Sequence, residues 1–310
     1  MRLVFCGTPQ FAVPTLKTLL RSGHDIPLVV TQPDRPSGRG MQLVAPPVKQ
    51  VALDAGLAVV QPEKIKNNAE FRAQMESAQP EAIIVVAYGR IVPKWMLDLP
   101  RHGNVNLHAS LLPKYRGAAP IQWAIANGEA VTGVTTMRID EGLDTGDMLL
   151  QREMAVAPDQ TAEDLFPLLA EMGAPLMAET LEGLVSGTIT SKKQDSALAT
   201  HAPILNREDG HVDFSRTAIE IYNRWRGFQP WPGAYTQFHG KKLVVHRMMP
   251  MELREESVSG QVRIERDRLF VDCGGNTRLE LLEVQLEGKK RMMVADFLRG
   301  YQLKNGDRFA

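Results

Sequence analysis

Asn106 and His108 lie two residues apart in the stretch Gly103–Gly117, which reads G-N-V-N-L-H-A-S-L-L-P-K-Y-R-G. The stretch begins as a β-strand, so the amide and the imidazole point to one face while Val105 and Leu107 point to the other. Such groups can hydrogen-bond an oxyanion and exchange a proton. A lone histidine is more often a hydrogen-bonded core residue, and a lone asparagine more often caps a turn. Two polar groups on one face of a buried strand instead favour a ligand as their partner.

A carboxylate that can complete such a site follows in Arg138–Asp147, which reads R-I-D-E-G-L-D-T-G-D. Two glycines and four carboxylates between two apolar runs are typical of a loop. From this loop Asp144 can act on the histidine, or it can only make an Asx turn before Gly146, which is what its residue type alone favours. The residues by themselves leave both interpretations open.

The combination N-x-H-x-S-L-L-P with D-x-x-x-D-T-G resembles the folate-dependent formyltransferases. From Val4 to about Arg247 the chain is similar to the members of that family that act on methionyl-tRNA. The similar segments are F-x-G-T-P-x-F, T-Q-P-D-R-P-S-G-R-G, V-V-A-Y-G, S-L-L-P-K-Y-R-G-A-A-P-I-Q, G-L-D-T-G-D-M and F-Q-P-W-P-G. The resemblance implies an enzyme that moves a formyl group from the co-substrate 10-formyltetrahydrofolate to the α-amine of initiator methionyl-tRNA, for translation initiation.

The resemblance also implies which residues carry the reaction, with Asn106, His108 and Asp144 catalytic. An α-amine has an ordinary pKa of about 8 and a neighbouring ester lowers it, so much of an aminoacyl-tRNA amine is neutral near pH 7 without a strong base. The harder task is to stabilise the tetrahedral oxyanion and to protonate the leaving N10. Asn106 can donate to the oxyanion, His108 can donate a second hydrogen bond or act as general acid, and Asp144 can orient His108 and accept a proton.

Folate contacts are expected at two places along the sheet edge. The resemblance assigns them, largely through the backbone, to Ser110, Leu111, Leu112 and Pro113. Tyr88 and Gly89 end an apolar strand at the same edge as His108, so their backbone groups are a further expected contact. A simple strand-ending turn explains these two residues equally well.

The expected tRNA contacts are basic residues in two clusters, Arg35 with Arg39 and Lys241 with Lys242. Arg35 and Arg39 belong to the long loop Gln32–Pro47. This loop contains four prolines and two glycines, so its sequence suits neither a helix nor a strand. The resemblance implies that this loop meets the tRNA acceptor end. The alternatives are a disordered insertion for the loop and an ordinary solvated surface for the basic residues.

Alternating strands and helices predict an α/β fold, a doubly wound, Rossmann-like, parallel-type sheet. The expected strands are 2–6, 26–31, 57–60, 82–88 and the one that carries Asn106, followed by a closing pair at 131–139 and 148–156. Helices are expected at 10–21, 48–55, 69–78 and 161–184. No G-x-G-x-x-G follows the first strand, which removes the main support for a dinucleotide-dependent oxidoreductase.

Five short strands and a late helix after residue 206 predict a small C-terminal β-barrel of the OB-like kind. The expected division is a catalytic domain at 1–190, a linker at 191–206 and a tRNA-binding domain at 207–310. The C-terminal part carries a small excess of Lys and Arg over Asp and Glu, which agrees with a nucleic-acid partner only weakly.

The composition is that of an ordinary soluble globular protein: 310 residues with zero formal net charge and 44% hydrophobic residues. We expect the protein to be cytoplasmic, because its sequence shows neither of the segments considered below. Zero net charge argues against a generic nucleic-acid coat. No signal peptide or membrane span is expected. Cys6 and Cys273 are far apart and lack a C-x-x-C or histidine pattern, so we expect buried free thiols and no metal. A monomer is expected.

Two other functions compete with this one. A related formyltransferase can act on a small amine, such as an amino-sugar nucleotide or glycinamide ribotide, but the long Gln32–Pro47 loop and the barrel suit a macromolecular acceptor better. A non-catalytic nucleotide- or RNA-binding module has no need for an amide, an imidazole and a carboxylate beside one another.

Overall fold

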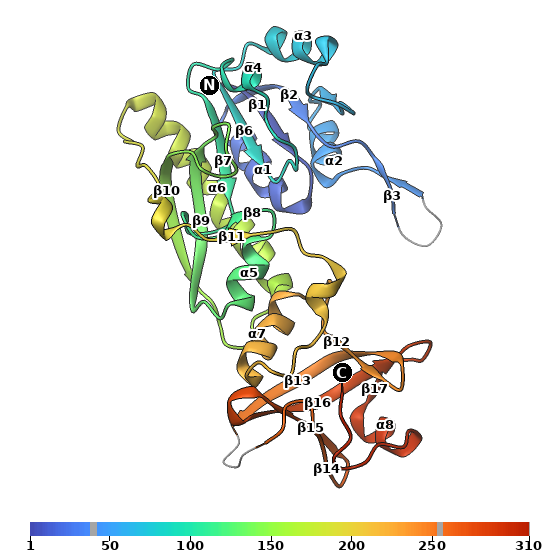
Figure 1. Cartoon of the computed structure of the whole chain (residues 1–310). Helices are drawn as coiled ribbons and strands as arrows, with labels where there is room; N and C mark the ends of the chain where they lie inside the picture. The colour runs from blue at the N-terminus through green and yellow to red at the C-terminus, as the bar shows by residue number, and fades with distance from the viewer. Residues whose placement is uncertain (38–41, 253–256, 310) are drawn as a thin grey trace. The chain divides into compact units, whose positions relative to one another are not determined.

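The computed structural model describes residues 1–37, 42–252 and 257–309, which form two compact units (Figure 1). The first unit comprises Met1–Pro120, Val131–Ala155 and Leu165–Pro203, and the second comprises Ile121–Ala130, Val156–Asp164 and Ile204–Ala310. The expected limits of the catalytic domain, linker and C-terminal domain stay predictions.

The described residues of the first unit form a seven-stranded sheet with the order β10-β9-β7-β6-β1-β2-β5. Five neighbouring strands, from β5 to β7, are parallel, and β9 and β10 are antiparallel additions at one edge. The bounds are β1 (Arg2–Gly7), β2 (Asp25–Val30), β5 (Val59–Val60), β6 (Ala82–Val86), β7 (Asn104–His108), β9 (Val131–Arg138) and β10 (Met148–Ala155). The predicted α/β sheet is therefore confirmed.

Helices connect these strands, as the alternating pattern predicts. Their bounds are α1 (Val13–Arg21), α2 (Pro47–Asp54), α3 (Ala69–Ala78), α4 (Lys94–Leu97), α5 (Pro120–Ala126) and α6 (Ala162–Ser186). The helix α3 has the predicted bounds because Asn68 caps it, accepting a hydrogen bond from the backbone N–H of Phe71. Phe71 and Met75 of this helix pack on Ile83 of β6 in a buried cluster, so apolar residues at helical spacing fix the helix on the sheet.

The long loop Gln32–Pro47 contains more regular structure than we predict from its sequence. The strands β3 (Arg35–Ser37) and β4 (Gln42–Val44) pair antiparallel within it. Pro36 is compatible with this ladder because β3 is an edge strand of a two-stranded sheet. The base of the hairpin is held by Lys49, whose Nζ donates to both carboxylate oxygens of Asp34 at 2.9 and 2.7 Å.

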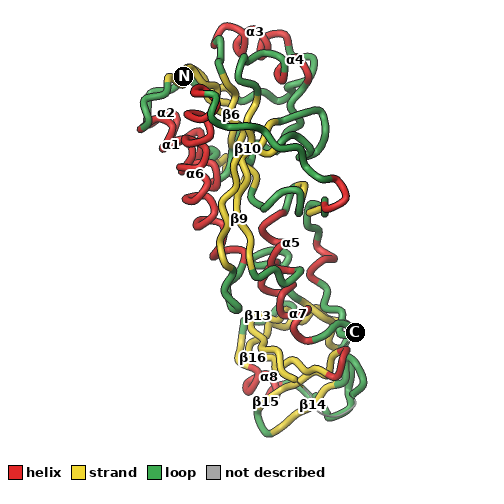
Figure 2. The backbone as a smooth tube through the Cα atoms, turned by 90° about the vertical axis from the view of Figure 1, so that its left-hand side faces the viewer, coloured by secondary structure: helices red, strands yellow, loops and turns green. Residues whose placement is uncertain are grey.

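The described residues of the second unit form a six-stranded antiparallel sheet, β12-β13-β16-β15-β14, with β17 on β16 (Figure 2). The bounds are β12 (Tyr235–Phe238), β13 (Lys241–Glu252), β14 (Val262–Glu265), β15 (Arg268–Cys273), β16 (Thr277–Leu286), β17 (Met292–Met293), α7 (Ala218–Gly227) and α8 (Val294–Gly300). The late helix and the five predicted strands are present, together with the additional strand β17. The strands β13 and β16 have 12 and 10 residues, so they are not short as predicted. Closure into a barrel stays a prediction.

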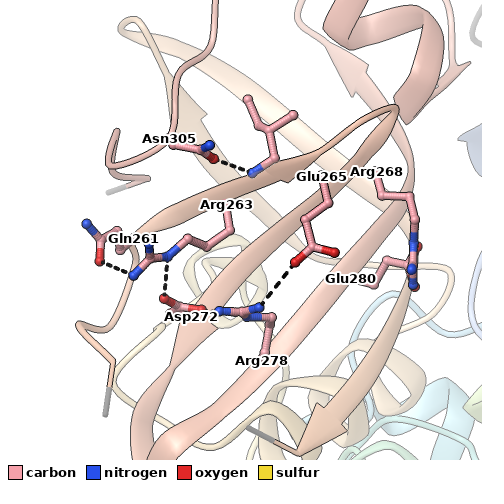
Figure 3. Close-up of polar contacts among 9 residues, drawn as sticks. Gln261, Arg263, Glu265, Arg268, Asp272, Arg278, Glu280 and Asn305 are labelled. Atoms are coloured by element: carbon pink, nitrogen blue, oxygen red, sulfur yellow. Dashed lines mark hydrogen bonds and ion pairs between the residues drawn. The ribbon is translucent and has the colours of Figure 1, made fainter. Parts of the chain in front are cut away.

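A buried carboxylate ties the strands of this sheet together. Asp272 is fully buried and accepts hydrogen bonds from Arg278 Nε at 2.7 Å and from Arg263 Nε at 3.3 Å (Figure 3). Arg268 binds both carboxylate oxygens of Glu280 at 2.7 Å and covers the ring of Phe270. Buried carboxylates need such partners because an unpaired charge in the interior is strongly destabilising.

Both cysteines are buried free thiols, as the sequence predicts. Burial raises the pKa of Cys6, and it raises the pKa of Cys273 to about 12. Both side chains are therefore neutral thiols near pH 7, which suits apolar packing and not nucleophilic chemistry.

Candidate active site

The strand β7 carries the candidate site on one face and packs on the core with the other. Val105 and Leu107 are buried, and a side chain at Gly173 of α6 would lie 2.5 Å from Leu107, so the helix approaches the strand closely there. On the opposite face stand Asn104, Asn106 and His108. The alternation of apolar and polar residues in this strand therefore places Asn106 and His108 together, as predicted.

His108 is buried, and both of its ring nitrogens face protein groups. Nε2 donates a hydrogen bond to the backbone carbonyl of Tyr115 at 2.8 Å, and it must carry a proton because a carbonyl can only accept. Nδ1 lies 3.7 Å from Asp144 Oδ2, which is beyond hydrogen-bond distance. Nδ1 is therefore the nitrogen that can exchange a proton with a bound substrate.

Asp144 reaches His108 from the loop between β9 and β10. The loop begins level with the start of β7, where Ile139 N–H donates to Asn104 O at 3.0 Å. Asp144 has a left-handed φ of 53°, and its Oδ2 accepts a hydrogen bond from Gly117 N–H at 2.9 Å. Asp140, and not Asp144, makes the local turn, because its Oδ1 accepts from Gly142 N–H and the Thr145 hydroxyl.

The side chain of Asn106 is half-buried. Within the described ranges, no residue forms a hydrogen bond with its side-chain amide. The neighbouring Asn104 differs, because its amide donates to the carbonyls of Met96 and Leu97 at the end of α4. Asn106 is thus the amide on this face that remains available to a ligand.

The segment Ser110–Pro113 follows β7 and is fixed by side chains that the sequence does not single out. The Ser110 hydroxyl donates to Lys114 O at 2.7 Å. Thr135 of β9 donates to Ser110 O and accepts from Leu112 N–H. Leu112 is buried against Met137 and Met148, while Leu111 and Pro113 are partly exposed. The turn therefore has a defined backbone beside His108.

The chain is similar to proteins of one known family along most of its length. Residues 1–181 match the formyl transferase family, and residues 204–302 match the formyl transferase C-terminal domain.

The chain belongs to the formyl transferase family.

Two curated members of the family are similar along almost the whole chain. The methionyl-tRNA formyltransferase of Acidobacterium capsulatum is 73% identical over 98% of this chain and 97% of its own length. That of Koribacter versatilis is 62% identical over 99% of this chain and 98% of its own. A solved N-formyltransferase from Helicobacter canadensis, in complex with folinic acid and dTDP-3-aminofucose, superposes with a TM-score of 0.66 over 91% of this chain and 98% of that chain. Its sequence identity is 18%, so this likeness concerns the fold.

Tyr88 and Gly89, two expected folate contacts, follow the C-terminal end of β6. The Tyr88 ring packs with Cys6 and Val92 in the apolar cluster under α3, and its hydroxyl has no hydrogen-bond partner in the part of the chain that the structure describes. Burial raises the pKa of this phenol. The Tyr88 carbonyl accepts a hydrogen bond from Gln32 Nε2 at 3.0 Å. Gln32 Nε2 also donates to the Gly89 carbonyl at 3.3 Å, but Gly89 is exposed whereas Tyr88 is buried. Gly89 is therefore the stronger candidate for a ligand contact.

The basic residues expected to contact tRNA are divided between the two units. Arg35 is exposed on β3 in the first unit, and Arg39 lies outside the described residues. Lys241 and Lys242 lie on β13 in the second unit, where Lys241 is exposed. Lys242 Nζ lies 3.8 Å from the centre of the Tyr235 ring, and burial lowers its pKa. Binding of tRNA by these residues stays a prediction.

Several residues that position the site cannot be found by local sequence patterns. Thr200 accepts from Tyr115 N–H at 2.9 Å through its hydroxyl, and thereby holds the turn whose carbonyl binds His108. Gln194 donates to the Asp144 loop. Both residues lie in the polar stretch 191–206 that we expect to be a linker, where composition alone indicates only a connection. Their partners are about 50 to 85 residues away in the chain, so only the fold brings them together.

Over residues 1–37, 42–252 and 257–309, no group of three His, Cys, Asp or Glu side chains has a metal-binding arrangement. Among the same described residues, no helix has the length and apolar character needed to cross a bilayer.

Proposed function

We propose that this protein transfers the formyl group of 10-formyltetrahydrofolate to the α-amine of methionyl-initiator tRNA. The observation that carries the proposal is that Asp144 Oδ2 lies 3.7 Å from Nδ1 of His108. The strand face of His108 also carries Asn106, whose side-chain amide has no hydrogen-bond partner among the described residues. The acceptor is supported by the 73% identity to an enzyme named methionyl-tRNA formyltransferase, which extends over both units.

Two observations support binding of the folate co-substrate at this site. The Asn106 amide needs a polar partner, which the formyl oxygen supplies. The partly exposed Leu111 and Pro113 lie in the turn that follows β7, which has a defined backbone and suits an extended aromatic ligand. We assign the folate contacts to Ser110–Pro113 and Gly89, with Tyr88 contributing through its position at the strand end.

The reaction forms a bond between the α-nitrogen of methionyl-tRNA and the formyl carbon, and breaks the bond from that carbon to N10 of the folate. The neutral amine attacks, the carbonyl oxygen becomes an oxyanion, and the nitrogen that attacked becomes positively charged. One proton must leave that nitrogen and one must reach N10 before it departs, so the net proton balance is zero. Tetrahydrofolate and N-formylmethionyl-tRNA are the products.

Each polar side chain of the site has a role in this sequence. The Asn106 amide donates to the oxyanion. His108, protonated at both nitrogens, keeps Nε2 on Tyr115 O and donates from Nδ1 toward the oxyanion or N10. Asp144 stabilises that imidazolium and takes part in removing the proton from the attacking amine. Asn106, His108 and Asp144 are in this proposal the catalytic residues.

We further propose that catalysis and tRNA binding are carried out by different parts of the chain. Residues 1–190 carry the catalytic side chains and 207–310 bind tRNA, with Lys241 and Lys242 as phosphate contacts. Residues 191–206 connect the two, and side chains in this stretch also hydrogen-bond with the turns of the active site. Arg35 and Arg39 contact the acceptor end from the loop after β2. The activity implies a cytoplasmic enzyme of translation, and its chemistry needs no second copy of the chain.

The test is a stoichiometric assay on the full chain. Purified protein is mixed with 10-formyltetrahydrofolate and charged initiator tRNA, and both tetrahydrofolate and formylmethionyl-tRNA are quantified over time. The proposal predicts that one tetrahydrofolate appears for each formylated tRNA, and that neither forms when the other substrate is left out. Release of tetrahydrofolate at the same rate without tRNA would show a hydrolase and contradict the proposal.

A further inference from the structure

The stretch after α6 runs back along the candidate active site instead of leaving it. Lys192 and Met148 exchange two backbone hydrogen bonds of 2.8 Å. Ten residues further, β11 (His201–Ala202) pairs with β8 (Arg116–Gly117). This stretch lies between the two family matches, which end at residue 181 and resume at residue 204.

Two side chains in this stretch contact the Arg138–Asp147 loop: the Ser191 hydroxyl donates to Asp147 Oδ2 at 3.2 Å at the end of the loop, and Gln194 contacts the turn at Asp144 itself. Its Nε2 donates to Asp144 O at 2.8 Å and to Gly146 O at 2.7 Å. Its Oε1 accepts from Arg116 Nε at 2.9 Å. Gln194 is half-buried and Arg116 is buried, so these three hydrogen bonds are only partly exposed to competition from water.

The hydrogen bonds act on a backbone conformation that needs support. Asp144 has φ of 53°, in the left-handed region that residues with a side chain seldom adopt. The two carbonyls that Gln194 binds lie on either side of Thr145 and therefore fix the course of this turn. With the turn fixed, the carboxylate reaches Gly117 N–H at 2.9 Å and stands 3.7 Å from His108 Nδ1.

We propose that Gln194 is a positioning residue for formyl transfer, holding the Asp144 loop in the conformation that directs its carboxylate to His108. The inference rests on the proposed function for the reaction that it serves. Gln194 touches neither reacting atom, and it acts through Asp144.

A primary amide is the group that these three partners require. Two carbonyls need N–H donors, and the Arg116 guanidinium needs an acceptor. Glutamate keeps the acceptor for Arg116 but places a negative oxygen against two carbonyls. Alanine removes all three hydrogen bonds. The pair Gln194→Glu and Gln194→Ala therefore separates the contact with the Asp144 loop from the contact with Arg116.

The experiment is a double-mutant cycle on the full chain, with Gln194→Ala, Gln194→Glu, Asp144→Asn and the two double variants. Lys193→Ala is the matched control, since Lys193 is the exposed neighbour. The acceptor is whichever amine the wild-type protein formylates, so a wrong acceptor assignment does not affect this test. We expect both Gln194 variants to lower kcat about tenfold to a hundredfold, with KM and the Kd of a folate analogue within about twofold. Lys193→Ala should resemble the wild type.

The cycle distinguishes positioning from a general structural role. If Gln194 acts through Asp144, its replacement adds little once Asp144→Asn has removed the carboxylate charge. Equal fold-losses in both backgrounds, together with a lower Tm and weaker binding of the folate analogue, would overturn the proposal.

A second readout does not depend on activity. In spectra of ring-labelled histidine at one fixed pH, the His108 signal should move in Gln194→Ala in the same direction as in Asp144→Asn, and should not move in Lys193→Ala. An unchanged His108 signal in Gln194→Ala would overturn the proposal even if activity is lost.

Discussion

Oδ2 of Asp144 lies 3.7 Å from Nδ1 of His108 and accepts a hydrogen bond from Gly117 N–H at 2.9 Å. One carboxylate oxygen of the loop after β9 therefore lies beside the end of β7 and contacts the last residue of β8. Because Nε2 of His108 is bound to Tyr115 O, the nitrogen beside this carboxylate is the one available for proton transfer.

Removal of the Asn106 amide should affect the transition state more than substrate binding. Asn106→Ala removes a donor to the oxyanion, so we expect kcat to fall about a hundredfold to a thousandfold, with a smaller change in KM. His108→Ala and Asp144→Ala should lower kcat by similar factors. The control is Gln50→Ala, at an exposed position of α2, which should leave kcat unchanged. Near wild-type kcat in all three variants, at saturating concentrations of both substrates, would show that the site is assigned wrongly.

Tyr88→Phe should stabilise the protein. The hydroxyl is buried and lacks a partner in the described residues, so deleting it removes an unsatisfied polar group, and we expect the free energy of unfolding to rise by about 1 kcal/mol. Urea unfolding measures this difference. Formyl transfer and the Kd of a folate analogue should not change, because the ring lies in the apolar cluster. If Tyr88→Phe binds the folate analogue more weakly and its free energy of unfolding is unchanged or lower, the hydroxyl contacts the ligand.

Elements with a local signal could be predicted from the sequence. The uninterrupted apolar run of β6 and the capping Asn68 of α3 are visible in the residues. The shared face of Asn106 and His108 follows from their spacing alone. The assignment of Asp144 could not be made in this way, because its residue type suits an Asx turn, and the fold gives that turn to Asp140 instead.

Contacts between distant segments could not be predicted. The polar stretch 191–206 has the composition of a linker, yet Gln194 and Thr200 in it hydrogen-bond with the Asp144 loop and the Tyr115 turn. The paired strands β3 and β4 could not be predicted either, because the prolines of the Gln32–Pro47 loop argue against a strand. In both cases the residues that pair with each other come together only when the chain has folded, so local sequence patterns do not indicate the pairing.

Stability on the acidic side should depend on Glu280. Hydrogen bonds from Arg268 lower the pKa of this carboxyl, more than burial raises it. Because the folded-state pKa is below the unfolded value of about 4.3, the charge of Glu280 stabilises the fold above that value, and this contribution is lost as pH falls through the folded pKa. The difference in unfolding free energy between wild type and Glu280→Gln should therefore be largest near pH 7 and should shrink below about pH 4. A difference independent of pH, in urea titrations from pH 7 to pH 3, would contradict this linkage.

Basic residues that contact tRNA should show a salt-dependent effect. Arg35→Ala and Lys241→Ala should each weaken binding of methionyl-tRNA, and should lower the slope of log affinity against log salt by about 1, because each removes one phosphate contact. Binding of a folate analogue should not change. Lys17→Ala, at an exposed position of α1, is the control. Slopes equal to that of the wild type would mean that these side chains are ordinary solvated surface.

A competition assay tests the proposed acceptor. Full-length protein and labelled 10-formyltetrahydrofolate are mixed with equal, limiting concentrations of methionyl-initiator tRNA, free methionine, glycinamide ribotide and a dTDP-amino sugar, and the distribution of the labelled formyl group among the products is measured. We predict that formylmethionyl-tRNA contains nearly all of the label in wild-type protein, and that His108→Ala lowers the total without changing the distribution. Label found mainly on a small amine would contradict the proposed function.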